Sequence, residues 1–486
     1  MNFCLITEDD QIRDDCGRLI ISRCCKPDTK NECNVRRGVN EMLRVFGSRF
    51  QNCDGISRRN FLEIGSSVLG LSMADIFRMR AAAAAENPFL SAKSSKSVIV
   101  FWTHGGLSQQ DTYDMKPDSP AEFRGPYQPV KTNVPGIEIT ERFPCQTRVM
   151  DKLSIVRSVY HESALHAASA HWMQTGYSGP TLARNAPQKP SFGSVIARAK
   201  GPNQPNLPAY VTIPKSEAFG YQGSVYLGVG SNPFELNADP NSPKFAVPNL
   251  TLPTDLSLQD VRHRADLLRR FDTLRRDVDA TGTLAGLDSF KVQALEMVTG
   301  DRVREAFDLN KESPELRDRY GRHLYGQSAL LARRLVEAGS TCVTINTGYW
   351  DHHAEIHKGM EEHLPPLDAA IAALVEDLDA RGMLENVVVY CAGEFGRTPM
   401  INGIAGRDHW PGSFSVIFGG GGLQGGRIVG ASEPRGGKVR ENPVTPLDVL
   451  ATLYHALDIP LETHFEDATG RPVSIVGSGR PIKELL

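Results

Sequence analysis

The sequence predicts a doubly wound α/β fold, in which helices cover both faces of a mostly parallel sheet. Short runs that are apolar almost throughout recur along the chain, which is typical of parallel strands buried on both faces. Amphipathic helical patterns separate several of these runs, and strands that alternate with helices favour a parallel sheet. The predicted strands are Ser97–Thr103, Leu153–Val156, Ala209–Ile213, Cys342–Ile345, Val387–Cys391 and Phe414–Phe418.

Residues 1–56 precede this pattern, and we expect a leader that is disordered or that results from a start codon placed too far upstream. Six of the nine cysteines lie there, without the paired C-x-x-C spacing of a zinc module. A disulfide knot in this leader would have little apolar core around it. The six are Cys4, Cys16, Cys24, Cys25, Cys33 and Cys53.

Residues 57–85 resemble a twin-arginine export signal. The pair Arg58-Arg59 precedes a moderately apolar stretch, Ile64–Phe77, and Ala81–Ala85 then offers the small residues that a signal peptidase needs. We therefore expect an exported protein, periplasmic or secreted, with the twin-arginine translocase as a partner during export.

The α/β domain is predicted over residues 96–486. Within it, Leu258–Asp279, Gly326–Ala338 and Pro366–Arg381 carry apolar residues at helical spacing. The stretch from about 201 to 254 is rich in Pro, Asn and Gly, which indicates a loop-rich insertion.

Composition excludes two classes of partner. Lys and Arg number 54 against 57 Asp and Glu, a formal net charge of −3, so the chain has no excess of basic residues for binding nucleic acid. No apolar run approaches the roughly 20 residues of a membrane span, so we expect no stable membrane span.

Ligands of open parallel sheets bind beyond the carboxyl ends of the strands, so the polar residues there are the candidate site. Asp111 follows the first strand after a Gly-Gly turn, although an isolated Asp can also serve as a helix cap. Three histidines fall within eleven residues after the second strand, and two of them, His166 and His171, are candidates for general acid or base or for ligands.

The later strands are followed by denser clusters. Asp351 and His353 form an Asp-x-His pair, and an Asp408-His409 pair lies in a later loop. Glu394 and Arg397 follow the Val387–Cys391 strand, and the guanidinium of Arg397 suits a tetrahedral anion. A purely structural role remains open for any one of these residues.

Mixed carboxylate and imidazole donors favour a transition metal over calcium. We therefore predict a divalent metal, zinc or manganese, with iron or calcium less favoured. The predicted ligands are Asp111, Asp351, His353, Glu394, Asp408 and His409.

Several motifs together resemble the domain of unknown function 1501 family, whose members are secreted and commonly twin-arginine-exported bacterial proteins. They are GGLSQQDTYDMKP (105–117), GYWDHHAEI (348–356), GEFGRTPMIN (393–402), GRDHWP (406–411) and TPLDVLATLYHALDIP (445–460). The family is grouped with the alkaline phosphatase and sulfatase superfamily. The resemblance implies that superfamily's doubly wound fold, one or two divalent metals, and attack on phosphate or sulfate esters.

The same resemblance implies roles for individual residues. Asp111 resembles the metal-binding Asp after the first strand, and Asp351 with His353 resembles a later metal pair. His409 resembles the histidine of the final loop. The nucleophile position, nine residues before Thr175-Gly176, falls on His166, where the superfamily has a hydroxyl or thiol.

Two functions follow as expectations. The first is a metal-dependent hydrolase that acts on a phosphate or sulfate ester of a small molecule or glycan, with attack by water or by a group of the site. In that function, Arg397 would hold a non-bridging ester oxygen. The second is a non-catalytic secreted protein on the same fold that binds a sulfated glycan or a partner protein.

Overall fold

The computed structural model divides the chain into two compact units, Met1–Phe89 and Leu90–Leu486. The residues that the structure describes are 12–13, 19–20, 95–179, 187–215, 220–247 and 301–486. In the first unit these form one antiparallel pair, β1 (Ile12–Arg13) with β2 (Leu19–Ile20). The predicted export signal and the predicted helix Leu258–Asp279 lie outside the described residues.

An eight-stranded sheet forms the centre of the second unit, in the order β14-β6-β13-β10-β3-β9-β7-β8. Every neighbouring pair is parallel except those of β13, which runs antiparallel to both β6 and β10. The six predicted strands are all present, and the mostly parallel sheet is confirmed. The strands are β3 (Ser97–Trp102), β6 (Leu153–Val159), β7 (Tyr210–Ile213), β8 (Phe234–Glu235), β9 (Cys342–Asn346), β10 (Val387–Ala392), β13 (Phe414–Gly420) and β14 (Arg427–Val429).

The strand register brings several chain ends to one edge of the sheet. Trp102 pairs with both Ala392 and Asn346, so β3, β10 and β9 end level with one another. Val159, the last residue of β6, pairs with Phe414, the first residue of the reversed strand β13. The segments that follow β3, β6, β9 and β10 and the segment that precedes β13 therefore meet at this edge.

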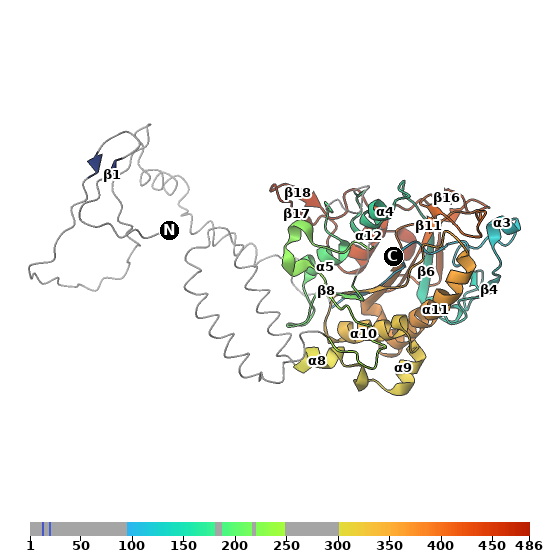
Figure 1. The fold of residues 1–486 in the computed structure, drawn as a ribbon, viewed down its shortest axis with the longest axis horizontal. Coiled ribbons are helices and arrows are strands. Elements are labelled where there is room, and N and C mark those ends of the chain that lie inside the picture. Colours follow the sequence, from blue (N-terminus) through green and yellow to red (C-terminus); the bar gives the residue numbers. More distant parts are fainter. Residues whose placement is uncertain (1–11, 14–18, 21–94, 180–186, 216–219, 248–300) are drawn as a thin grey trace, which may run out of the picture. The chain divides into compact units, whose positions relative to one another are not determined.

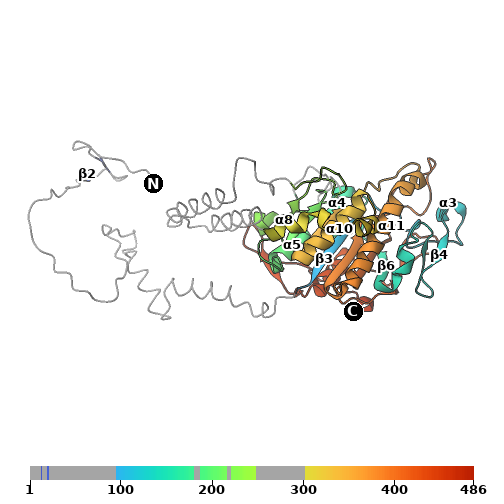
Figure 2. The same cartoon turned by 90° about the horizontal axis from the view of Figure 1, so that it is seen from below.

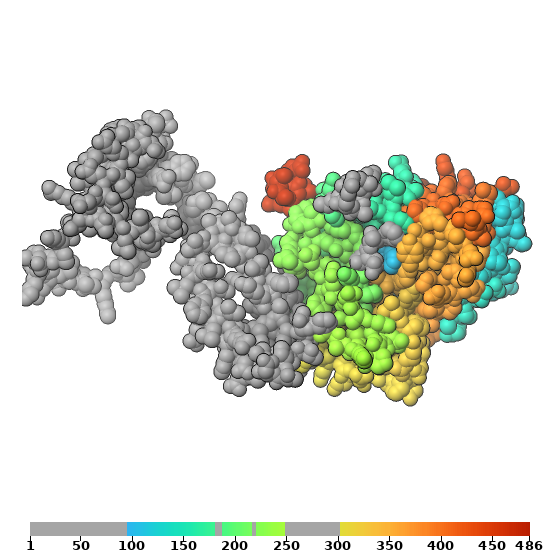
Figure 3. All heavy atoms as spheres, in the orientation of Figure 1, coloured from blue at the N-terminus to red at the C-terminus, as the bar shows by residue number. Residues whose placement is uncertain are grey.

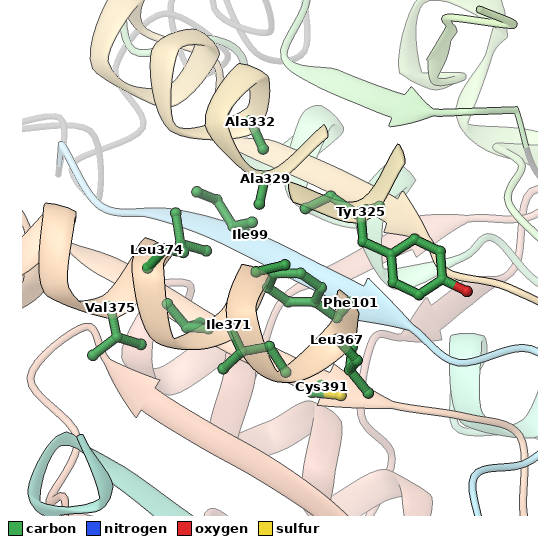
Figure 4. Packing of buried hydrophobic residues seen from close by; sticks show 14 of the residues in the cluster. Ile99, Phe101, Tyr325, Ala329, Ala332, Leu367, Ile371, Leu374, Val375 and Cys391 are labelled. Carbon is green, nitrogen blue, oxygen red and sulfur yellow. The ribbon is translucent and has the colours of Figure 1, made fainter. Parts of the chain in front are cut away.

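Helices cover both faces of the sheet, as predicted (Figure 1). On one face, Ile99 and Phe101 of β3 pack against α10 (Leu324–Ala338) and α11 (Ile356–Ala380) (Figure 4). Figure 2 shows these two helices beside β3. On the other face, alternate residues of the same strands pack against three further helices. These are α4 (His166–Thr175), α5 (Phe192–Lys200) and α12 (Pro446–Ala456).

Smaller elements surround this core. The further helices described are α3 (Ala121–Arg124), α8 (Asp301–Phe307) and α9 (Pro314–Tyr320). Short antiparallel pairs are β4 (Pro129–Lys131) with β5 (Glu138–Thr140), β11 (Gly396–Arg397) with β12 (His409–Trp410), β15 (Ala431–Ser432) with β16 (Val439–Glu441), and β17 (His464–Glu466) with β18 (Pro472–Ser474). Among the described residues, no helix has the length and apolar character needed to cross a bilayer.

Two elements differ from their predicted extents. Helix α11 begins at Ile356, ten residues before the predicted start at Pro366, and includes Pro365 and Pro366. The buried residues Met360 and Leu364 continue its apolar stripe, so packing extends the helix through the prolines. Segment 201–254, predicted as a loop-rich insertion, contributes β7 and β8 to the sheet, and in Figure 3 its light-green surface adjoins the yellow surface of the 301–340 region.

Candidate metal centre

Asp351 lies at the centre of a cluster of histidines at the edge where the strands end. Its Oδ1 is 3.0 Å from Nε2 of His409 and 3.0 Å from Nε2 of His353, and its Oδ2 is 3.2 Å from Nε2 of His166. One donor atom each from His166, Asp351 and His409 lies within 4.8 Å of the other two. These three residues therefore meet the basic distance requirement for sharing a metal ion.

The topology of the sheet explains why these residues meet. His166 is the first residue of α4, which follows β6, and Asp351 follows β9. His409 lies on β12, directly before the reversed strand β13. The pairing of His409 with Arg397 in the β11–β12 ribbon fixes its backbone beside the segment that follows β10. Residues far apart in the sequence thus reach one place because they adjoin strand ends at the same edge.

In each of the three histidines, Nδ1 faces a hydrogen-bond acceptor. A carboxylate or carbonyl oxygen accepts a hydrogen bond but cannot donate one, so in the neutral ring Nδ1 carries the hydrogen and Nε2 presents a lone pair. The pairs are His166 with Glu394 Oε1 at 2.7 Å, His353 with Asp408 Oδ1 at 2.7 Å, and His409 with the Ala164 carbonyl at 2.8 Å. In this tautomer, a neutral imidazole at each of the three positions would turn the lone pair of its Nε2 toward Asp351, as metal binding requires.

This arrangement fits a cation. Nε2 of His353 and Nε2 of His409 are 2.9 Å apart, a separation at which two lone pairs repel unless a positive charge lies between or beside them. The carboxylates of Asp351, Glu394 and Asp408 face one guanidinium, that of Arg397, so the cluster with neutral histidines has an excess of negative charge. Glu394 Oε2 is buried and has no hydrogen-bond partner in the described part of the chain.

The pKa shifts reflect the same charges. Burial alone would raise the pKa of Asp351, but its contacts with His166, His409 and Arg397 hold it well below its ordinary value. Burial alone would lower the pKa of His166, whereas hydrogen bonds to Asp351 and Glu394 raise it overall. Without a metal, the site thus keeps Asp351 ionised and favours a proton on His166, where a bound cation would otherwise supply the positive charge.

Arg397 has a different position from the predicted one, because it does not face the open side of the site. Its side chain is fully buried, and it donates to the carbonyl oxygens of Gly105, Gly106 and Arg407 and to Oδ1 of Asp351 at 2.6 Å. These bonds occupy the guanidinium, so the structure places Arg397 as the residue that holds Asp351 rather than as a contact for an ester oxygen.

Asp111 lies outside the cluster. Its carboxylate is fully buried, 2.8 Å from Nε of Arg407, and it also accepts a hydrogen bond from Ser108 Oγ at 2.5 Å and contacts His357 at 3.1 Å. Asp111 was predicted as a metal ligand, but in the structure it forms a buried ion pair with Arg407. Burial alone would raise its pKa, but Arg407 lowers it overall.

His171 also lies apart from the cluster. It is on α4 with His166, but its Nδ1 is bonded to the carbonyl of Tyr177, and the backbone N–H of Lys189 donates to its Nε2. Its ring stacks on Tyr221, and burial lowers its pKa. These contacts are those of a structural histidine. The five-residue spacing from His166 turns the two side chains to different sides of the helix.

Two predicted ligands, Glu394 and Asp408, contact histidines of the cluster rather than Asp351. Glu394 is fully buried, binds His166 through Oε1, and accepts a hydrogen bond from the backbone N–H of Gly105 at 2.8 Å. Asp408 has a half-exposed side chain and binds His353. Such carboxylates orient metal-binding histidines and fix their tautomers, so both belong to the site without touching Asp351.

Sequence reasoning missed three contributors. Arg407 closes the buried pair with Asp111, and Phe395, 1% exposed, stacks against His409 with ring centroids 4.5 Å apart. The hydroxyl of Tyr349 donates to Asp351 Oδ2 at 2.9 Å. All three stand within two residues of a predicted residue in the sequence, but their role depends on side-chain directions that spacing does not give.

Comparisons with known proteins place the sequence in a family. Among solved structures, Ps i-CgsB in complex with k-i-k-neocarrahexaose is 12% identical, with 76% of this chain and 73% of that chain covered and a TM-score of 0.36. The PsFucS1 sulfatase from Pseudoalteromonas sp. is 13% identical, with coverage of 78% and 71% and a TM-score of 0.33. A TAB5 alkaline phosphatase mutant with bound Mg is 12% identical, with coverage of 71% and 95% and a TM-score of 0.31.

No curated protein matches the sequence significantly. The family model described as "Protein of unknown function (DUF1501)" matches residues 95–486, which is most of the chain and the whole of the sheet domain. The matched region includes every residue of the cluster around Asp351. The chain therefore belongs to the DUF1501 family.

Proposed function

We propose that this protein is an exported, metal-dependent hydrolase of phosphate or sulfate esters. The observation that carries the proposal is the convergence of three imidazole Nε2 atoms on the carboxylate of Asp351, with each Nδ1 bonded to an acceptor. The Arg58-Arg59 pattern at the N-terminus supports export through the twin-arginine translocase.

The residues that would hold the metal are Asp351, His409 and His166, with His353 beside them. Imidazole and carboxylate donors together suit zinc or manganese. When bound, such an ion polarises an ester oxygen and lowers the pKa of a water molecule. Glu394, Asp408 and the Ala164 carbonyl would keep the imidazoles in the tautomer that binds metal.

Other residues prepare the site for an anionic ester. Arg397 holds Asp351 from the buried side, and the ring of Phe395 excludes water from beneath His409. Tyr349 stands on the open side with 49% of its surface exposed, and its hydroxyl can turn from Asp351 to donate to an ester oxygen.

Attack by water is favoured over attack by a serine. Near α4, Ser169 Oγ donates to the Ser163 carbonyl and Ser163 Oγ accepts from the Leu165 N–H, so both hydroxyls are engaged with the backbone. His166, at the position where the superfamily has its nucleophile, is bonded to Glu394 and Asp351 instead.

The test measures metal and turnover separately. The full chain is purified, its metal content is determined by mass spectrometry, and aryl phosphate mono- and diesters, phosphonates and aryl sulfates are assayed. We expect stoichiometric zinc or manganese and turnover of at least one ester class. Asp351→Asn and His409→Ala should lose the metal and lower kcat/KM by about 100-fold or more.

His455→Ala is the matched control, because His455 is an exposed histidine on α12 away from the cluster. It should retain metal and turnover. Protein that binds no metal and hydrolyses no ester contradicts the proposal. Stoichiometric metal without turnover of any ester favours the non-catalytic binding function instead.

A further inference from the structure

The exposed apolar side chains of the described residues concentrate beside the metal centre. Seven large apolar residues are strongly exposed, and four of them lie on segments that contribute residues to the cluster or form hydrogen bonds with it. They are Leu165 at 51%, Tyr349 at 49%, Met400 at 55% and Ile404 at 63% exposure. The other three are Val225, Val229 and Leu486. Single exposed apolar residues are ordinary, but their gathering around one site is informative.

Hydrogen bonds connect the segments of these four residues to the cluster. Leu165 follows Ala164, whose carbonyl accepts from His409, and Tyr349 donates to Asp351. Met400 and Ile404 lie on loop 398–406. In that loop the amide of Asn402 donates to the His353 carbonyl at 2.9 Å, and Thr398 Oγ1 accepts from the N–H of Asp408 at 2.9 Å. The apolar residues therefore flank the metal centre on three of its segments.

The charges on the same segments have one sign at the surface. In segments 161–166, 349–355 and 398–410, the exposed ionised side chains are the carboxylates of Glu162, Glu355 and Asp408, and Glu355 is paired at 3.4 Å with Lys358, three residues further along. The one Lys or Arg in these three segments is Arg407, which is fully buried against Asp111. A glycan with many sulfate groups would be repelled by Glu162 and Asp408, and the exposed Lys358 beside these segments is already paired with Glu355.

From these two features we infer the class of substrate, which rests on the proposed function. The site takes an ester whose organic group is apolar and uncharged, alkyl or aryl, rather than a polyanionic glycan. The anionic ester head faces the cluster, while Leu165 and loop 398–406 contact the apolar group. Each methylene buried in such a contact strengthens binding by about threefold to fourfold.

The test measures binding without turnover. Inorganic phosphate and ethyl, butyl and octyl phosphonate, which resist ester hydrolysis, are titrated into the zinc-loaded full chain by calorimetry, together with a sulfated tetrasaccharide. We expect octyl phosphonate to bind at least about tenfold tighter than ethyl phosphonate, and the tetrasaccharide to bind more weakly than either. Equal affinity along the alkyl series, or tighter binding of the tetrasaccharide, overturns the inference.

Two double variants test which residues cause the tighter binding of the longer alkyl phosphonates. Leu165→Ser with Ile404→Ser should remove most of the gain between the ethyl and octyl compounds and leave binding of inorganic phosphate unchanged. Val225→Ser with Val229→Ser removes two equally exposed valines on other segments and should leave the whole series unchanged. A loss of the alkyl gain in both pairs contradicts the assignment. If no ester is hydrolysed, the proposed function fails, but this series still decides which organic group the site accepts.

Discussion

Arg397 links four segments of the site through one buried side chain. From the segment after β10, it reaches the turn after β3, the segment after β9 and the segment before β12, because its partners are Gly105, Gly106, Asp351 and Arg407. A planar guanidinium with five donors can satisfy this many acceptors, whereas an ammonium on a flexible stem cannot reach them together.

Arg397→Lys should therefore be destabilising although the charge is kept. Buried carbonyls that lose their donors cost about 1–3 kcal/mol each where no water replaces them, so we expect a loss of roughly 2–4 kcal/mol in the free energy of unfolding. Urea denaturation measures it. Arg440→Lys, at a half-exposed arginine paired with Glu441, is the control and should stay near wild type. Equal stability of the two variants would contradict the role assigned to Arg397.

His161 should make stability depend on pH. Its ring is 4% exposed, stacks on Trp172, donates from Nε2 to the Glu394 carbonyl and accepts from the Ser163 N–H. Burial lowers its pKa from 6.5 to about 4. Between these values the unfolded chain binds the proton and the folded chain does not, so stability falls as pH falls from about 6.5 to 4.

The expected loss from this residue is up to about 3 kcal/mol. Urea denaturation at pH 7, 5.5 and 4.5 should show a steeper decline for the wild type than for His161→Gln, which cannot titrate. Parallel declines for the two proteins would show that the imidazole does not cause the pH dependence.

At the residue scale, the sequence indicated most residues of the cluster but not which of them contact Asp351 and which contact the histidines. Asp351, His353 and His409 were predicted as ligands and do meet, because strand ends share an edge. Glu394 and Asp408 orient histidines because each faces an Nδ1 atom, and no spacing rule predicts which ring nitrogen a carboxylate will face. Asp111 was misplaced because its partner, Arg407, lies almost 300 residues away and was not considered as a buried cation.

At the scale of elements, strands were more predictable than helix limits. The six apolar runs all form strands, since burial on both faces leaves a signal in the sequence itself. Strand direction leaves no such signal, so the reversal of β13 was not predicted. That reversal matters because it brings Asp408 and His409 to the edge where the other strands end. The early start of α11 was missed because packing of Met360 and Leu364 outweighs the local preference of two prolines.

Helix α12 offers a prediction at this scale. Thr445 and Asp448 form a capping box, in which the Thr445 hydroxyl accepts from the Asp448 N–H and the Asp448 carboxylate accepts from the Thr445 N–H at 2.9 Å. Thr445→Ala should lower the free energy of unfolding by about 1 kcal/mol, and Thr445→Ser, which keeps the cap, by much less. Urea denaturation compares the two, and equal losses would contradict a capping contribution.

The cap also bears on the site, because α12 packs against α4, which begins with His166. Gly176, which ends α4 in a left-handed conformation (φ +80°), leaves no room for a Cβ beside Leu447. Close packing of the two helices thus helps to fix the start of α4 at the sheet edge.

At the scale of the whole molecule, a bound metal should stabilise the fold. An ion that binds the folded chain and not the unfolded one adds about 4 kcal/mol at a thousandfold excess over its Kd. Treatment with a chelator should lower Tm, and zinc or manganese should restore it. Asp351→Asn should show the same Tm with and without metal. A wild-type Tm that is unaffected by chelator would contradict a metal bound at this site.

The distribution of the donors along the chain sets an order of events during biosynthesis. His166, Asp351 and His409 are separated by 185 and 58 residues, and the last of them comes 77 residues before the C-terminus. A nascent polypeptide that has emerged only through β9 lacks His409 and, with it, the β12 ribbon that orients this histidine. If the proposed site binds a metal, the ion can therefore meet all three donors only after the segment through His409 has left the ribosome.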